Sequence, residues 1–227
     1  MALAIFDLDD TLLAGDSNAL WSEFLAERGV LDGAANARAR ARYDQAYASG
    51  TLDIHDYTAF MLEPVLDWPA ERLLDWQQRF VEERVLPALY PAALELLERH
   101  RMAGDTLLIM TATNRVITGP IARILAVEHL LATEPERRGG RYTGRIAGIP
   151  CFRQGKVQRL QLWLEASGAS LAGSHFYSDS HNDLPLLELV EHPVAVNPDP
   201  RLAAHARHRD WPVLRLEAPA AVQRRSG

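Results

Sequence analysis

The feature that most constrains the fold is the opening stretch MALAIFDLDDTLLAGDS. Ala2–Leu8 is short and rich in Leu, Ile and Phe, which is typical of a parallel strand covered on both faces. Asp7, Asp9 and Asp10 gather at its carboxyl end, where neighbouring carboxylates repel one another unless a positive charge lies between them. We therefore predict a central strand of an open α/β sheet whose end faces a ligand.

The rest of the chain has two patterns. From Asp16 to about Arg84 the apolar residues recur at three- and four-residue steps, which predicts an all-helical insertion of three or four helices. After Pro87 helical and extended segments alternate, as they do in βαβ units. The predicted strands are Thr106–Met110, Ser174–Ser178, Val194–Val196 and Val213–Leu216, with a hairpin in Gly139–Ile146. The predicted helices are Ala92–Arg101, Arg115–Ala126, Lys156–Ala166, Leu184–Val190 and Pro200–His208.

These patterns predict an α/β protein with a doubly wound, Rossmann-like, mostly parallel sheet and an inserted all-helical cap domain. The predicted domains are an α/β core at residues 1–14 and 86–217 and a helical cap at residues 15–85. We predict that residues 218–227 form a disordered tail, because they have little to bury.

Composition excludes several classes of protein. The net charge of −6 argues against a general nucleic-acid binder, and we predict that the basic clusters Arg137–Arg141 and His205–Arg209 are solvated faces. We find no apolar run of the ~18 residues that a membrane span requires and no secretory signal, so we expect a cytoplasmic protein. The single cysteine, Cys151, cannot form an internal disulfide and is predicted to be an ordinary, partly buried thiol.

Four polar stretches follow predicted strands or begin a helix, at the edge where an open α/β sheet binds its ligands. They are Phe6–Thr11, Ile109–Thr113, Gly155–Lys156 and Tyr177–Asp183. We expect their side chains to meet in one crevice.

Together these side chains suit phosphoryl transfer. Asp7 and Asp179 offer carboxylate oxygens to a Mg²⁺ ion, which needs only one or two such ligands besides water and substrate phosphate. The Asp7 carboxylate can attack phosphorus in line and form an aspartyl phosphate. Asp9 can protonate the leaving alkoxide and then activate the water that hydrolyses the intermediate. The Thr111 hydroxyl and the Lys156 charge can stabilise the phosphoryl oxygens.

The motifs resemble those of the haloacid dehalogenase superfamily, and within it the phosphoserine-phosphatase-like branch, which has a helical cap after the first motif. DLDDT resembles the DxDxT motif, and SDSHNDLPLL resembles the DGxNDxxM region. Thr111 and Lys156 correspond to the second-motif Ser/Thr and the third-motif lysine, so the match spans nearly the whole chain. Ala112–Thr113 stands where this branch carries a pair of glycines.

The resemblance implies a role for each motif residue. Asp7 would be nucleophile and metal ligand, Asp9 would be acid and base with its backbone carbonyl on Mg²⁺, and Asp179 would be a direct metal ligand. Asp183 would act in the outer shell through a metal-bound water. Asn182 would help to bind the phosphate or to position the loop.

Several polar and aromatic residues have competing interpretations. Asp10 is predicted to be a turn or capping residue. Thr113 can replace Thr111 in binding phosphate, although the motif spacing favours Thr111. His181 can bind substrate or metal, but an exposed loop histidine is favoured. Core or cap packing is favoured over a substrate wall for most of the cap aromatics, namely Trp21, Trp68, Trp76, Tyr43 and Tyr47.

The resemblance also bears on the substrate, because two features of true phosphoserine phosphatases are changed. Asp16 stands where those enzymes carry a glutamate for the substrate amine, and no arginine for the carboxylate occurs in Gly50–Phe60. A carboxylate is hard to bind tightly without a bidentate arginine. We therefore predict an amino alcohol phosphate such as histidinol phosphate, with Asp16 holding the amine. Phosphoserine is the alternative, as is a phosphotransferase or phosphomutase reaction through the same intermediate.

Two further classes fit less well. A dehalogenase needs no leaving-group acid, so it leaves Asp9 without a role. A phosphoreceiver domain would be shorter and would lack the helical insertion. We predict a Mg²⁺-dependent phosphomonoesterase that acts on a small phosphorylated metabolite, without nucleic-acid or membrane partners, as a monomer or homodimer.

Overall fold

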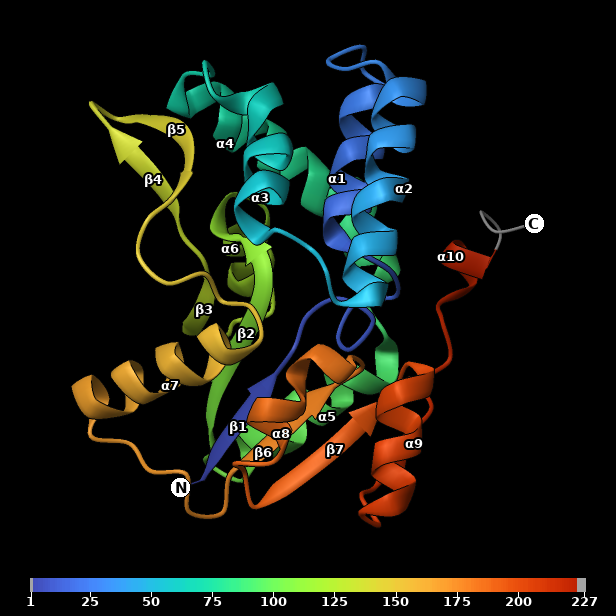
Figure 1. The fold of residues 1–227 in the computed structure, drawn as a ribbon, viewed down its shortest axis with the longest axis vertical. Helices are drawn as coiled ribbons and strands as arrows, with labels where there is room; N and C mark the ends of the chain where they lie inside the picture. The colour runs from blue at the N-terminus through green and yellow to red at the C-terminus, as the bar shows by residue number, and fades with distance from the viewer. Residues whose placement is uncertain (1, 224–227) are drawn as a thin grey trace.

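The central element is a six-stranded sheet, seen in a computed structural model that describes residues 2–223 (Figure 1). Its strand order is β3-β2-β1-β6-β7-β8, and neighbouring strands pair in parallel. The strands are β1 (Leu3–Phe6), β2 (Thr106–Asn114), β3 (His129–Thr133), β6 (His175–Ser178), β7 (His192–Val196) and β8 (Val213–Leu214). The predicted parallel sheet with β1 inside it is therefore confirmed.

Helices cover both faces of this sheet. One layer contains α5 (Pro91–Met102) and α6 (Arg115–Ile124), and the other contains α7 (Gln154–Ser167), α8 (Leu184–Leu187) and α9 (Pro200–His208). Successive side chains of β1 point to opposite faces, so Ala4 and Phe6 pack in the first layer while Leu3 and Ile5 pack in the second. All four are buried, which explains why this strand has no polar residue before Asp7.

A helical segment separates β1 from α5 and lies on the side of the sheet where β1 ends (Figure 1). It contains α1 (Ser17–Ala26), α2 (Gly33–Ser49), α3 (Ile54–Leu62) and α4 (Ala70–Phe80), with 3₁₀ turns at Glu63–Val65 and Leu86–Ala88 and a π-helical turn at Val81–Val85. Asp16, Asp32 and Asp53 begin the first three helices by accepting backbone N–H hydrogen bonds at their N-caps. The helical content agrees with the sequence, whereas the division into a core and a cap stays a prediction.

Packing inside this segment accounts for the tryptophans. Trp21 is buried, and its ring centroid lies 5.0 Å from that of Phe80. Trp68 and Trp76 meet edge to face at 4.9 Å. The packing role predicted for these three tryptophans is confirmed.

The two ends of the helical segment leave the sheet side by side. The Ala14 N–H donates to the Ala88 carbonyl at 2.8 Å, and the Tyr90 N–H donates to the Leu12 carbonyl at 3.0 Å. The incoming and outgoing chains are thus hydrogen-bonded to each other as a short antiparallel pair.

Two elements differ from the sequence prediction. Strand β3 is missing from the prediction, and it lies at the edge of the sheet, where it pairs with β2. Within the predicted tail, the described residues 218–223 include the helix α10 (Ala220–Gln223), and Ala218 and Val222 pack on the core. Residues 224–227 lie outside the described part of the chain.

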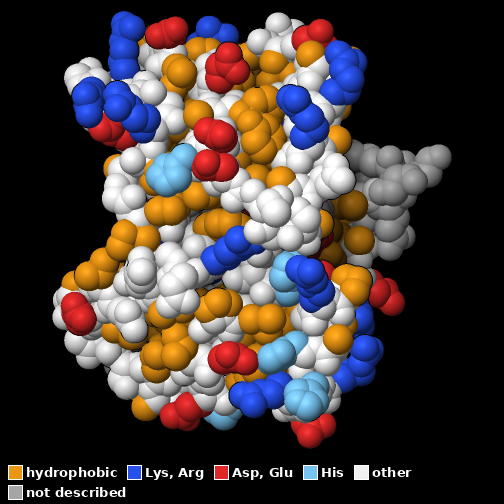
Figure 2. Space-filling model, viewed as in Figure 1, with side chains coloured by type: hydrophobic (Ala, Val, Ile, Leu, Met, Phe, Trp, Pro, Cys, Tyr) orange, Lys and Arg blue, Asp and Glu red, His pale blue; other side chains and the backbone are white. Residues whose placement is uncertain are grey.

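The predicted hairpin is present as β4 (Pro135–Arg138) and β5 (Arg141–Ile146), which pair in an antiparallel sense. Gly139 and Gly140 form its turn with φ angles of +56° and +81°, a conformation that glycine adopts without strain. Arg137, Arg138 and Arg141 are exposed there, and basic side chains gather over this hairpin at the upper left of Figure 2. Within residues 2–223, each helix is too short or too polar to cross a bilayer.

Candidate active site

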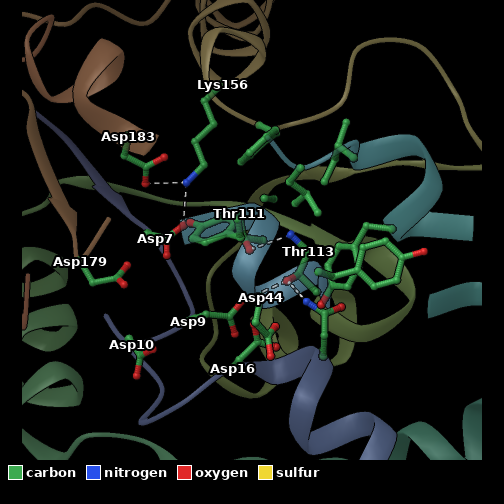
Figure 3. A pocket seen from close by; sticks show the side chains of 18 of the residues that line it. Asp7, Asp9, Asp10, Asp16, Asp44, Thr111, Thr113, Lys156, Asp179 and Asp183 are labelled. Carbon is green, nitrogen blue, oxygen red and sulfur yellow. Dashed lines mark hydrogen bonds and ion pairs between the residues drawn. The ribbon is translucent and has the colours of Figure 1, made fainter. Parts of the chain in front are cut away.

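A pocket of about 300 Å³ lies where the carboxyl ends of the strands face the helical segment (Figure 3). Its walls come from the ends of β1 and β2, the start of α7, the loop after β6, and helices α1, α2 and α3. Most of the predicted site residues line it, namely Asp7, Asp9, Asp16, Thr111, Lys156, Asp179 and Asp183. The structure therefore brings together side chains that are up to 176 positions apart in the sequence.

Lys156 lies at the buried end of this pocket. Its Nζ atom donates to Asp7 Oδ1 and to Asp183 Oδ2, both at 2.7 Å. The Ser178 hydroxyl also donates to Asp183 Oδ2 at 2.7 Å, which holds that carboxylate in place. Burial lowers the pKa of Lys156, but the charges of Asp183 and Asp7 more than offset this effect and raise the pKa well above its ordinary value. Lys156 is therefore a fixed positive charge.

The sequence just before Lys156 explains how a lysine reaches this depth. A Cβ atom on Gly155 would lie 2.1 Å from the Pro150 carbonyl oxygen, a distance that no side chain tolerates. Only glycine allows the first turn of α7 to pack so closely against the preceding loop. This close approach places Lys156 over the end of β1.

The carboxyl groups beside Lys156 are crowded. Burial raises the pKa of Asp7 to about 7, with the Lys156 charge opposing the shift and the Asp183 charge adding to it. Burial also raises the pKa of Asp179 well above its ordinary value, and the charges of Asp7 and Asp10 increase the shift. The cluster therefore holds more negative charge than Lys156 alone can balance.

A divalent cation fits this excess of charge. Asp7, Asp9 and Asp179 carry hard oxygen donors, which suit Mg²⁺, and Figure 3 shows the Asp179 carboxyl group on the same side of the pocket as Asp7. Among residues 2–223, no three His, Cys, Asp or Glu side chains form a ready-made metal cluster. Mg²⁺ does not need one, because it usually keeps several waters and takes one or two carboxylates.

Asp9 is held separately from Asp7. Its Oδ1 atom accepts the Ser17 N–H at 2.7 Å, and its Oδ2 atom accepts the Thr113 hydroxyl at 2.9 Å. Burial raises the pKa of Asp9 well above its ordinary value, and the charges of Asp16 and Asp7 raise it further. Because Thr113 is turned toward Asp9, the buried Thr111 hydroxyl at the end of β2 is the better placed of the two to meet a phosphate.

The predictions for three loop residues have different outcomes. Asp10 has a φ of +52° and accepts the Gly15 N–H at 2.9 Å, so the predicted turn role is confirmed. Asn182 does not line the pocket, contrary to the predicted phosphate contact, because its Oδ1 atom accepts the Arg153 Nε–H at 2.9 Å. His181 is not freely exposed, since its side chain is 15% exposed and its Nδ1 atom lies 2.7 Å from Asp199 Oδ2.

Helix α2 supplies pocket residues that the sequence analysis missed. Arg40 lines the pocket and donates to the Ala19 carbonyl at 3.3 Å, so the absence of arginine from Gly50–Phe60 does not leave the pocket without one. Asp44 lines the pocket one turn further along α2. An alternating Ala and Arg sequence gives no apolar stripe, so nothing in it indicates which arginine faces inward.

Aromatic side chains form the wall opposite the strand ends. Tyr43, Tyr47 and Tyr57 all line the pocket, and the rings of Tyr43 and Tyr57 lie 5.1 Å apart. The Tyr47 hydroxyl donates to Ser180 Oγ at 2.9 Å, which links α2 to the loop after β6. The packing role predicted for Tyr43 and Tyr47 is therefore incomplete, because both also face the cavity.

Three features together define a class of hydrolase. They are a parallel sheet with a pair of aspartates at its strand ends, a buried lysine beside them, and a helical segment over the pocket. The model of the haloacid dehalogenase-like hydrolase family matches residues 4–188, and the chain belongs to this family. It is 38% identical over 219 residues to the histidinol-phosphatase of Neisseria meningitidis, covering 95% of this chain and 99% of that protein.

Solved structures share this fold. A protein of unknown function from Bordetella pertussis is 43% identical and superposes with a TM-score of 0.87 over 94% of this chain and 97% of its own. A substrate-bound phosphoserine phosphatase superposes with a TM-score of 0.66 at 16% identity, over 94% of this chain and 92% of its own. The second likeness is one of fold alone.

Proposed function

We propose that this protein is a Mg²⁺-dependent phosphomonoesterase that hydrolyses a small phosphorylated metabolite through an aspartyl phosphate on Asp7. The observation that carries the proposal is the meeting of Asp7, Asp9 and Lys156 in one pocket, where Asp7 and Lys156 are buried. Family membership and the similarity to a histidinol-phosphatase support the same class of reaction.

The first step transfers the phosphoryl group to the protein. A carboxylate oxygen of Asp7 attacks phosphorus, and the bond between phosphorus and the alcohol oxygen breaks. Asp9 gives its proton to the departing oxygen, which leaves as a neutral alcohol. Lys156 and the Thr111 hydroxyl stabilise the phosphoryl oxygens during the transfer.

The second step releases phosphate. Asp9, now ionised, takes a proton from a water molecule that attacks phosphorus, and the bond to the Asp7 oxygen breaks. Asp7, Asp179 and the backbone carbonyl of Asp9 would hold Mg²⁺, with Asp183 acting through a bound water. When bound, Mg²⁺ neutralises charge on the phosphate and offsets the repulsion among the carboxylates.

For the substrate we propose an amino alcohol phosphate such as histidinol phosphate. Asp16 and Asp44 place two carboxylates on the wall remote from Lys156, where a substrate ammonium can lie. The rings of Tyr43 and Tyr57 offer flat faces to a cationic or aromatic group. The relative from Neisseria meningitidis is named for this class of substrate.

This assignment predicts activity on a defined set of esters. With Mg²⁺, we expect phosphate release from histidinol phosphate to exceed that from sugar phosphates and nucleotides in kcat/KM, and chelation by EDTA to abolish it. Alcohol and phosphate should appear in equal amounts, because water accepts the phosphoryl group. Alcohol in excess of phosphate would indicate a phosphotransferase, and release that is unaffected by EDTA would contradict the metal requirement.

Phosphoserine remains a second candidate because Arg40 lines the pocket. If Arg40 binds a substrate carboxylate, Arg40→Gln will lower kcat/KM for phosphoserine about 10- to 100-fold, the worth of a charged hydrogen bond. In either case Arg40→Gln should change kcat/KM for histidinol phosphate little, because that ester has no carboxylate. Arg38→Gln, on an exposed part of the same helix, is the matched control. Steady-state kinetics on both esters decide between the two substrates.

A further inference from the structure

A chain of two hydrogen bonds, the first buried and the second partly buried, leads from helix α1 to Asp9. Asn18 Nδ2 donates to Thr113 Oγ1 at 2.8 Å, and Thr113 Oγ1 donates to Asp9 Oδ2 at 2.9 Å. Asn18 and Thr113 are 3% and 6% exposed, so water does not compete strongly for these bonds. Figure 3 labels Thr113 and Asp9, the two residues at the end of this chain.

The chemistry of the three groups fixes the direction of this chain. An amide nitrogen has only protons to offer, so the Thr113 oxygen must accept from Asn18. A threonine hydroxyl has a single proton, which is then directed at Asp9 Oδ2. The Ser17 N–H occupies Oδ1 at 2.7 Å, so each oxygen of Asp9 is held by a different donor.

Asp9 needs such a restraint because its neighbours repel it. Asp7 lies two residues before it on the chain, and Asp16 lines the same pocket next to Ser17, whose N–H donates to Asp9. The charges of Asp7 and Asp16 therefore favour rotation of an unrestrained Asp9 carboxylate away from both. A general acid loses most of its effect when it leaves hydrogen-bonding reach of the leaving oxygen. Holding the carboxyl plane therefore matters more here than at an isolated aspartate.

We propose that Thr113, oriented by Asn18, is the positioning residue that keeps Asp9 directed at the leaving-group oxygen. The inference rests on the proposed phosphatase function and adds to it. Thr113 stands where the branch that this chain resembles carries glycine, which has no side chain to make this bond. Because Asn18 belongs to α1, the restraint also joins Asp9 to the helical segment above the pocket.

The test compares two substrates that differ in their need for an acid. Histidinol phosphate releases a strongly basic alkoxide that requires a proton, whereas p-nitrophenyl phosphate releases a weakly basic phenolate that leaves without one. We expect Thr113→Val to lower kcat/KM for histidinol phosphate about 10- to 100-fold, as for a lost hydrogen bond to a charged group. For p-nitrophenyl phosphate we expect a change within about twofold. kcat/KM is the appropriate constant because it reports formation of the aspartyl phosphate.

Two matched variants accompany this measurement. Thr113→Ser keeps the hydroxyl and should keep the native kcat/KM on both esters. Thr118→Val removes an equally buried threonine hydroxyl, one that donates only to the Asn114 carbonyl at 3.2 Å, and should leave both rates unchanged. If Thr113→Val lowers kcat/KM equally for both esters, or for neither of them, the positioning role is wrong. If the native protein releases phosphate from neither ester with Mg²⁺, the proposed function itself is wrong.

Discussion

An Asp7→Asn variant will hydrolyse phosphate esters at least ~10³-fold more slowly than the native protein, because an amide cannot attack phosphorus. The loss should appear in kcat, measured as phosphate release with Mg²⁺. The variant should also fail to retain radiolabelled phosphate after acid quenching, whereas the native protein should trap the label as an aspartyl phosphate. Native-like turnover by Asp7→Asn would contradict the nucleophile assignment.

A folding defect must be excluded as the cause of this loss of activity. Asp7 has a raised pKa because it is buried, so a neutral amide removes a desolvated charge while Lys156 keeps its contact with Asp183 at 2.7 Å. We therefore expect the thermal midpoint of Asp7→Asn to equal or exceed that of the native protein. Asp67→Asn makes the same chemical change at a side chain that is 93% exposed, and it should be native in both measurements.

A Lys156→Met variant will lose both activity and stability. Removing the ammonium leaves the carboxyl groups of Asp7 and Asp183 buried without the partner that lies 2.7 Å from each. Breaking a buried charge pair in this way typically costs about 3–5 kcal/mol in the free energy of unfolding. Urea unfolding measures the stability loss, and phosphate release should fall with it because the phosphoryl oxygens lose their fixed charge.

A double variant separates this explanation from simple misfolding. Lys156→Met combined with Asp183→Asn removes one of the two stranded carboxylates, so it should recover part of the stability but none of the activity. Mg²⁺ should raise the midpoint of Lys156→Met more than that of the double variant, since more uncompensated charge remains in the single variant. A Lys156→Met variant as stable as the native protein would contradict the charge balance described for the pocket.

The strand-end part of the pocket follows from the sequence. Asp7 follows β1 and Asp179 follows β6, and the carboxyl ends of neighbouring parallel strands share one edge of a sheet. The order of Thr111 and Lys156 along the chain then places both beside Asp7. These positions depend on strand periodicity and parallel pairing, which a single sequence expresses well.

The remaining walls depend on packing that a single sequence does not express. Arg40 and Asp44 lie on a helix that buries no residue, so its inward face has no hydrophobic marker. Asn182 has the expected place in the loop, but Arg153 occupies its amide oxygen. Strand β3 is a short edge strand that pairs with β2, and so short a segment carries little strand periodicity in its sequence.

The hydrogen bond between Ala14 and Ala88 has a consequence for how such proteins diversify. Because the two ends of the helical segment lie side by side, the segment between them does not alter the length or register of β1 and β2. We therefore expect that a stretch of DNA encoding residues 19–87 can be exchanged for another while Asp7, Thr111 and Lys156 keep their places and Ser17 and Asn18 continue to hold Asp9. Changes in the exchanged segment can then adapt the protein to a new metabolite, while the residues that break the phosphate ester bond stay the same.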